Sequence, residues 1–116
     1  MKRKIGGVVI ACLAMVVTSG AVARELQPKE KVIIEQATKA QLKDPDSATF
    51  YWQDYKGGDV YCAHVNAKNS YGGFAGKALL LVGVKNDSHG NITSADVSIR
   101  SDNMMDKICT KRGYSV

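Results

Sequence analysis

Along residues 28–42 the apolar side chains recur at the spacing of an α-helix. The apolar face is narrow and rich in alanine, and it consists of Val32, Ile33, Ala37 and Ala40, with Ile34 alongside. Pro28 suits the first turn of a helix, and the pair Asp44-Pro45 prevents the helix from continuing. The pattern therefore predicts an amphipathic N-terminal helix that lies across a sheet.

Four later segments have the composition or the alternation of β-strands. They are Ala48–Tyr55, which is rich in aromatic residues, Val60–Asn66 and Ile92–Arg100, which alternate, and Lys77–Lys85, which is apolar on both faces. A strand that is apolar on both faces is expected in the middle of a sheet. Short turns at Lys56–Asp59 and Asn86–Asn91 connect the strands. We expect the aromatic cluster Phe50–Tyr55 to belong to the core more than to a contact surface.

A second helix is predicted after the last strand, with Ser101 or Asp102 as its N-cap and Gly113 after its end. Its apolar face is expected to consist of Met104, Met105, Ile108 and Cys109. The order of elements predicts an α+β fold with an N-terminal helix, a four-stranded, mostly antiparallel sheet and a C-terminal helix.

The N-terminus has the pattern of a secretory signal peptide. Lys2, Arg3 and Lys4 precede an apolar run from Ile5 to Val17, and Ala21-Val22-Ala23 forms a small-x-small cleavage site. The apolar run is shorter than the roughly 20 residues needed to span a bilayer. We therefore predict a signal peptide at 1–23, a single domain at 24–116 and no membrane span after cleavage. The segment Val9-Ile10-Ala11-Cys12 leaves open a lipoprotein anchored through Cys12.

Removal of this leader changes the charge of the protein. The full chain carries a net charge of +5, and three of its basic residues are Lys2, Arg3 and Lys4, so the predicted mature domain carries +2. This small excess does not favour a nucleic-acid partner.

Two cysteines, Cys62 and Cys109, remain in the predicted mature domain. In an exported domain an even pair favours a disulfide. In the chain-entropy model, closing a loop of about 48 residues stabilises a domain by roughly 4 kcal/mol. Two free thiols, or one reactive thiol, are the alternatives.

The sequence offers little for catalysis or for metal binding. Gly72–Lys77 lacks the spacing and the hydroxyl residue of a phosphate-binding loop, and the histidines, cysteines and aspartates show no paired metal-ligand spacing. We therefore expect neither a cofactor nor a metal. The alternative is a small envelope hydrolase that uses His64 with an acid such as Asp59.

The segment from Asn66 to Gly76 is the best candidate for binding. It combines hydrogen-bonding side chains, aromatic rings and glycines, at Asn66, Asn69, Ser70, Tyr71, Gly72, Gly73 and Phe74. A structural Ω-loop whose aromatic rings pack back onto the sheet is the alternative.

Two stretches carry a resemblance to a known group of proteins. They are Leu42-Lys43-Asp44-Pro45-Asp46-Ser47-Ala48-Thr49-Phe50 and the segment from Val60 to Phe74, which includes Cys62-Ala63-His64-Val65-Asn66-Ala67-Lys68-Asn69-Ser70-Tyr71-Gly72-Gly73. Both are similar to small exported proteins of proteobacteria and their prophages that share an LKDPxSAxF turn and a C-G-x-VNxKNxYGGY segment. Ala63 and Phe74 depart mildly from that pattern. The resemblance implies an exported α+β domain and no particular reaction.

Together these features predict an exported, periplasmic or secreted, non-enzymatic binding domain. We expect its partner to be a periplasmic or envelope protein or a glycan. An inhibitor of an envelope enzyme, or an accessory protein of a secretion or phage-exclusion system, would fit this description.

Overall fold

The computed structural model describes residues 23–68, 76–99 and 103–116. Its elements, in chain order, are α1 (Pro28–Lys39), the 3₁₀ turn η2 (Pro45–Ser47), β1 (Thr49–Tyr51), β2 (Val60–Asn66), β3 (Ala78–Asn86), β4 (Ile92–Ile99) and α2 (Asn103–Lys111). The predicted leader up to Val22, including Cys12, lies outside the described residues, as do the predicted caps Ser101 and Asp102.

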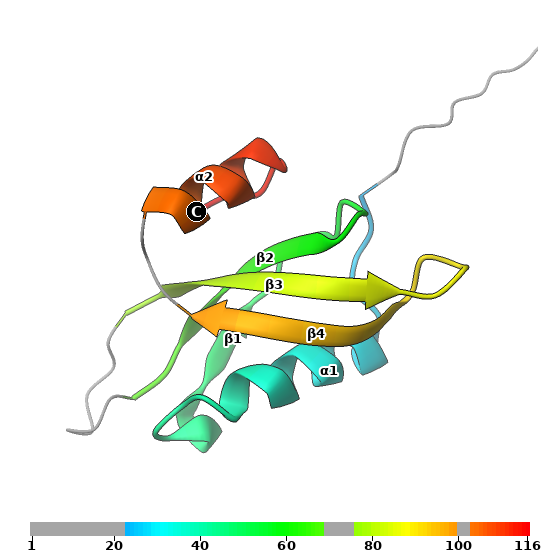
Figure 1. Cartoon of the computed structure of the whole chain (residues 1–116). Helices are drawn as coiled ribbons and strands as arrows, with labels where there is room; N and C mark the ends of the chain where they lie inside the picture. The colour runs from blue at the N-terminus through cyan, green and yellow to red at the C-terminus, as the bar shows by residue number, and fades with distance from the viewer. Residues whose placement is uncertain (1–22, 69–75, 100–102) are drawn as a thin grey trace, which may run out of the picture.

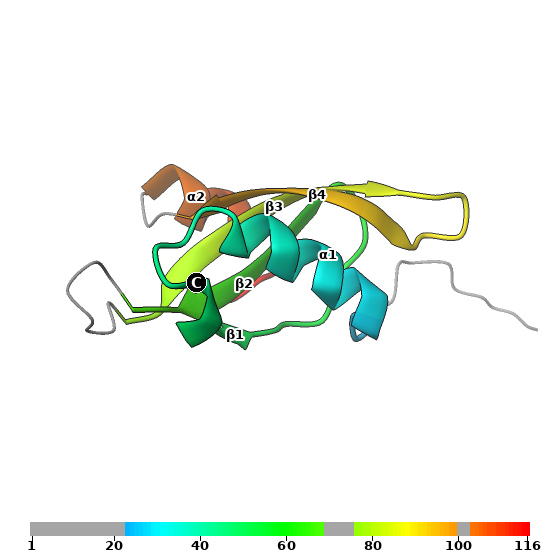
Figure 2. The same cartoon turned by 90° about the horizontal axis from the view of Figure 1, so that it is seen from below.

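The four strands form one sheet in the order β1-β2-β3-β4. Every pairing in this sheet is antiparallel, with Tyr51 opposite His64 and Val82 opposite Val97. The two helices lie on opposite faces of the sheet, α1 below it and α2 above it in Figure 1, and α1 stands in front of the sheet in Figure 2. The predicted α+β fold is confirmed. Because both faces are covered, the inner strand β3 buries Leu79, Leu80 and Val82.

The buried side of α1 differs from the predicted one. Glu30, Ile34 and Thr38 are buried at successive i, i+4 positions, whereas Val32 is 48% exposed and Ala40 is exposed. The prediction that Val32 and Ala40 lie on the core face is therefore wrong. The helix is turned so that the Glu30 carboxylate points inward, where it accepts hydrogen bonds from Arg24 and from the Ile92 N–H. The helix also ends at Lys39, before the predicted Leu42.

The first strand is shorter than predicted, because it ends at Tyr51 and does not reach Tyr55. The hydroxyl of Tyr61 donates to the Gln53 carbonyl (2.7 Å) and accepts from the Gln53 N–H (2.8 Å). The hydrogen bonds that a neighbouring strand would make with the backbone of Gln53 are therefore made by a side chain. Tyr55 instead pairs with Arg24 in an isolated bridge. The Lys56–Asp59 turn consequently lies within a longer connection between β1 and β2.

The aromatic cluster is only partly in the core. Tyr55 is buried, but Tyr51 is 36% exposed. Phe50 and Trp52 are half-buried and stack on each other, with ring centroids 5.1 Å apart. The expectation of a core role therefore holds for Tyr55 and is wrong for Tyr51.

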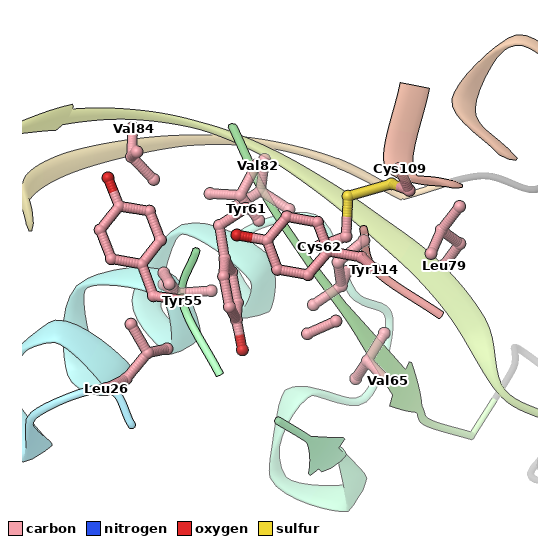
Figure 3. Close-up of a cluster of buried hydrophobic side chains, with 14 of the residues drawn as sticks. Leu26, Tyr55, Tyr61, Cys62, Val65, Leu79, Val82, Val84, Cys109 and Tyr114 are labelled. Atoms are coloured by element: carbon pink, nitrogen blue, oxygen red, sulfur yellow. A yellow bond between two sulfur atoms is a disulfide. The ribbon is translucent and has the colours of Figure 1, made fainter. Parts of the chain in front are cut away.

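A disulfide between Cys62 and Cys109 ties α2 to β2, as predicted, with 6.0 Å between the two Cα atoms. Both cysteines are fully buried, and Figure 3 shows the bond near the ring of Tyr114. On α2, Met105 is buried while Met104 is 71% exposed, so the prediction for Met104 is wrong. Gly113 (φ 90°) then reverses the chain in a left-handed conformation that glycine adopts readily, and the Tyr114 N–H bonds to the Cys109 carbonyl.

Candidate functional site

The structure describes only part of the predicted binding segment from Asn66 to Gly76. Asn66 is the last residue of β2 and is half-buried, and its Oδ1 atom is buried with no hydrogen-bond partner among the described residues. The other six candidates, Asn69, Ser70, Tyr71, Gly72, Gly73 and Phe74, lie outside the described residues. Their role in binding stays a prediction. Ala67, Lys68 and Gly76, which are the described residues next to positions 69–75, line a groove.

We call this groove the end groove. It lies just after α1, where β2 and β4 end and β3 begins, and its cavity volume is about 230 Å³. It is formed by Gln41, Leu42, Lys43, Val65, Ala67, Lys68, Gly76, Ala78 and Ile99. Val65 is almost completely buried, and Leu42, Ala78 and Ile99 are half-buried. The end groove therefore has an apolar floor assembled from segments that are far apart in the sequence.

Hydrogen bonds hold the walls of the end groove in place. After α1, the Gln41 N–H bonds to the Thr38 carbonyl, and the Gln41 side-chain amide donates to the Val97 carbonyl of β4 (2.6 Å). On the other side, the Lys68 N–H donates to the hydroxyl of Ser47 (2.9 Å), which links the end of β2 to the turn η2. Two walls are thus fixed by contacts within the domain before any ligand arrives.

The charged side chains among the described lining residues of the end groove are basic. Lys43 and Lys68 belong to its lining, and no carboxylate is among the described residues that line it. Asp44 follows Lys43 in the sequence but does not contribute to the lining. The groove therefore combines an apolar floor with a basic rim.

The groups proposed for hydrolysis do not come together in the structure. His64 lies in β2 opposite Tyr51 and Leu79, and burial, together with the nearby Lys77, lowers its pKa below the ordinary value. Asp59 pairs with Arg112 at 3.1 Å, which lowers the pKa of Asp59. Five residues of extended chain, or about 16 Å, separate Asp59 from His64. At this distance the carboxylate cannot orient the imidazole.

Other chemistry is also limited in the described part of the chain. Cys62 and Cys109 are joined to each other, so neither presents a thiol. Among residues 23–68, 76–99 and 103–116, no three potential metal ligands of the His, Cys, Asp or Glu type gather in one place. Within the same residues, none of the helices has the length and apolar character needed to cross a bilayer.

Sequence reasoning missed the end groove because four separate segments build it. The signal that was available lies in the positions of Leu42, Val65 and Ile99, which are apolar residues at the end of a predicted element or one residue before it. Reasoning from local patterns also missed the burial of Glu30. Its position three residues after Gln27, whose N–H donates to the Glu30 carboxylate (2.8 Å), is the spacing of a capping box.

Comparisons with protein-family models, with curated proteins and with solved structures gave no match to this chain. The resemblance to small exported proteins therefore stays a prediction, and the functional argument rests on the site itself.

Proposed function

We propose that this protein is an exported, non-enzymatic interaction domain that binds a protein of the periplasm or envelope through the end groove. The observation that carries this proposal is the preformed, apolar, basic-rimmed groove of about 230 Å³. Pockets for small molecules usually have volumes of about 300–1,000 Å³. A smaller groove is better suited to one side chain of a protein partner than to an entire small ligand.

Two further features support export. The disulfide between Cys62 and Cys109 is typical of proteins that fold in an oxidising compartment. The N-terminal pattern of a basic segment, an apolar run and Ala21-Val22-Ala23 is typical of a cleaved leader. We therefore propose that the mature domain begins at Arg24 and acts in the periplasm or outside the cell.

A protein partner fits the end groove better than a glycan does. Sugars are held mainly by hydrogen bonds and by stacking on exposed aromatic rings, whereas the described floor of this groove is aliphatic and carries no aromatic side chain. The position of Asp59, about 16 Å along the extended chain from His64, favours a binding role over hydrolysis by these two residues. An inhibitor or an accessory subunit of an envelope assembly is the kind of protein that we propose.

Affinity capture after crosslinking in the native periplasm tests this proposal. Ala67 lines the groove, and the Ala67→Phe substitution would fill part of it. Ser94 is exposed on β4, and Ser94→Phe is the matched control away from the groove. We expect the wild-type protein and Ser94→Phe to retain the same partner and Ala67→Phe to lose it, with folding verified by circular dichroism.

Equal capture by all three proteins would contradict the proposal. A Tyr71→Ala/Phe74→Ala variant, tested in the same way, would show whether the predicted loop contributes to the contact.

A further inference from the structure

We infer that the docking of Arg24 closes the bond between Ala23 and Arg24 to proteolysis, so that the predicted leader is removed before the domain folds. This inference rests on the export that forms part of the proposed function, and it adds the order in which cleavage and folding occur. Three observations carry it, namely the backbone pairing of Arg24, the ion pair of its side chain and the fixed position of its backbone partner.

The nitrogen atom of the bond to be cut is itself part of the fold. Hydrolysis of this bond adds water, so that Ala23 gains a carboxylate and Arg24 gains a free amino group. In the folded domain the Arg24 N–H donates to the Tyr55 carbonyl (2.9 Å), and the Tyr55 N–H donates to the Arg24 carbonyl (2.6 Å). Ala23 is exposed, whereas Leu26 is already buried. The predicted cleavage site therefore directly borders the folded domain.

This pairing competes with the binding of a peptidase. Extended peptides are recognised through hydrogen bonds of their backbone, and a peptidase has to reach both sides of the bond that it cuts. The backbone of Arg24 cannot make those hydrogen bonds while it is paired with Tyr55. The rate of cleavage of the folded precursor therefore follows the fraction of molecules in which Arg24 is released from the domain.

The side chain of Arg24 makes this release unfavourable. Its two terminal nitrogens donate to the Glu30 carboxylate at 2.7 Å each, and one of them also donates to the Gly90 carbonyl (3.0 Å). The Glu30 side chain is completely buried, so release of Arg24 would leave a buried carboxylate without its cationic partner. The guanidinium group also lies over the ring of Tyr55, 5.2 Å from the ring centre.

The backbone partner of Arg24 is held in place by other parts of the domain. Tyr55 is 2% exposed, and its ring packs edge-on against Tyr61 of β2, with ring centroids 6.2 Å apart. The Tyr55 hydroxyl bonds to the Gly58 carbonyl and to the side chain of Asn86 at the end of β3. Because these partners belong to the sheet and its connections, Arg24 gains its docking site only when the sheet has formed. An unfolded precursor therefore leaves the bond open.

Cleavage of the full-length precursor by a purified bacterial signal peptidase in detergent micelles tests the inference. One preparation is folded, with the disulfide intact, and is alkylated without reduction. The other is reduced and fully alkylated, and it cannot fold because Cys62 and Cys109 are completely buried in the native domain. We expect mass spectrometry to show cleavage after Ala23 in the unfolded preparation, and cleavage at least about tenfold slower in the folded one.

Two changes to the precursor test the role of the anchor. A flexible Gly-Ser spacer of about ten residues between Ala23 and Arg24 leaves the anchor intact and moves the bond away from the domain. We expect the folded spacer precursor to be cleaved as fast as the unfolded one, to within about twofold. In the folded Glu30→Gln precursor, cleavage should be at least about tenfold faster than in the wild type. Glu25→Gln, a change at an exposed neighbour, is the matched control and should be cleaved at the rate of the wild type.

Three results would overturn the inference: equal rates for the folded and unfolded wild type, a spacer that leaves the folded precursor resistant, or a folded Glu30→Gln precursor that is cleaved no faster than Glu25→Gln. The first rate comparison and the spacer decide the matter even if Glu30→Gln does not fold, because neither changes the anchor.

The failure of this inference can be distinguished from the failure of the proposed function. If the unfolded precursor is cut after Ala23 and the folded one is cut equally fast, export stands and only the order of events is wrong. If the unfolded precursor is not cut after Ala23, the proposed export through this leader fails as well. Capture of a partner through Ala67 is measured on the domain itself, so it tests the end groove independently of both results.

Discussion

Among the single residues, the buried carboxylate of Glu30 joins three parts of the chain. It accepts hydrogen bonds from both terminal guanidinium nitrogens of Arg24 at 2.7 Å. It also accepts hydrogen bonds from the Gln27 N–H at 2.8 Å and the Ile92 N–H at 2.7 Å. The residues before α1, the first turn of α1 and the start of β4 are therefore joined through one side chain. The hydrogen bonds from Arg24 are the largest cause that lowers the pKa of Glu30, to about 2.

This network predicts an acid-dependent loss of stability. Because the pKa of Glu30 falls from its ordinary value of 4.5 to about 2 on folding, its contribution is complete above pH 4.5 and is lost as the pH falls through 2. We expect a loss on the order of 2–3 kcal/mol from this residue. Urea unfolding of the wild type and of Glu30→Gln at several pH values measures it.

At neutral pH, Glu30→Gln should cost roughly 3 kcal/mol because Arg24 loses its charged partner. Its unfolding free energy should also depend less on pH between 4.5 and 2. Glu25→Gln, an exposed neighbour, is the control and should behave as the wild type. Identical acid profiles for Glu30→Gln and the wild type would show that Glu30 is not the group responsible.

The burial of Glu30 also shows a limit of single-residue prediction. A glutamate at the start of a helix is ordinarily a solvent-exposed residue, and the local pattern does not indicate that the half-exposed Arg24 would pair with its buried carboxylate. The sequence prediction therefore placed Val32 and Ala40 on the core face of α1. The structure turns the helix so that Ile34 and Thr38 are buried with Glu30.

The secondary-structure elements were predictable to different degrees. The third strand was predicted well because its apolar residues on both faces require cover on both sides, which α1 and α2 provide. β1 was predicted too long, since the hydroxyl of Tyr61 takes the place of a strand partner at Gln53. Aromatic composition alone does not indicate where such a side-chain contact ends a strand.

The orientation of α2 can be tested with two adjacent residues of the same type. Met105 is 3% exposed and Met104 is 71% exposed. We expect Met105→Ala to lower the free energy of unfolding by roughly 2–4 kcal/mol because it leaves a cavity. Met104→Ala should change it by less than about 0.5 kcal/mol. Chemical denaturation of both variants measures the difference, and equal effects would contradict the observed face of α2.

The disulfide makes a separate prediction for the attachment of α2. Since the bond joins α2 to β2, we expect the Cys62→Ala/Cys109→Ala variant to lose roughly 2–5 kcal/mol of stability. Mass spectrometry without reduction should find the wild-type domain two hydrogen atoms lighter than its reduced form. Alkylation of two thiols in the unreduced native domain would contradict the bond.

For the whole molecule, the arrangement of the two helices determines where a partner can bind. α1 covers one face and stops near the end of the sheet where β2 and β4 end and β3 begins. The end groove is lined by residues at this end of the sheet and just after α1. From its composition, the sequence predicted binding by the loop from Asn66 to Gly76, most of which lies outside the described residues. It could not predict the groove, because Leu42, Val65 and Ile99 meet only after the sheet has formed and α1 has packed on it.

Photo-crosslinking in living cells tests the central claim, that the end groove contacts a protein partner, most directly. A photoreactive phenylalanine derivative would replace Ala67 in the groove, and in a second protein it would replace the exposed Ser94 as the control. We predict a protein adduct of defined mass from position 67 and none from position 94. No adduct from position 67, or the same adduct from both positions, would contradict it.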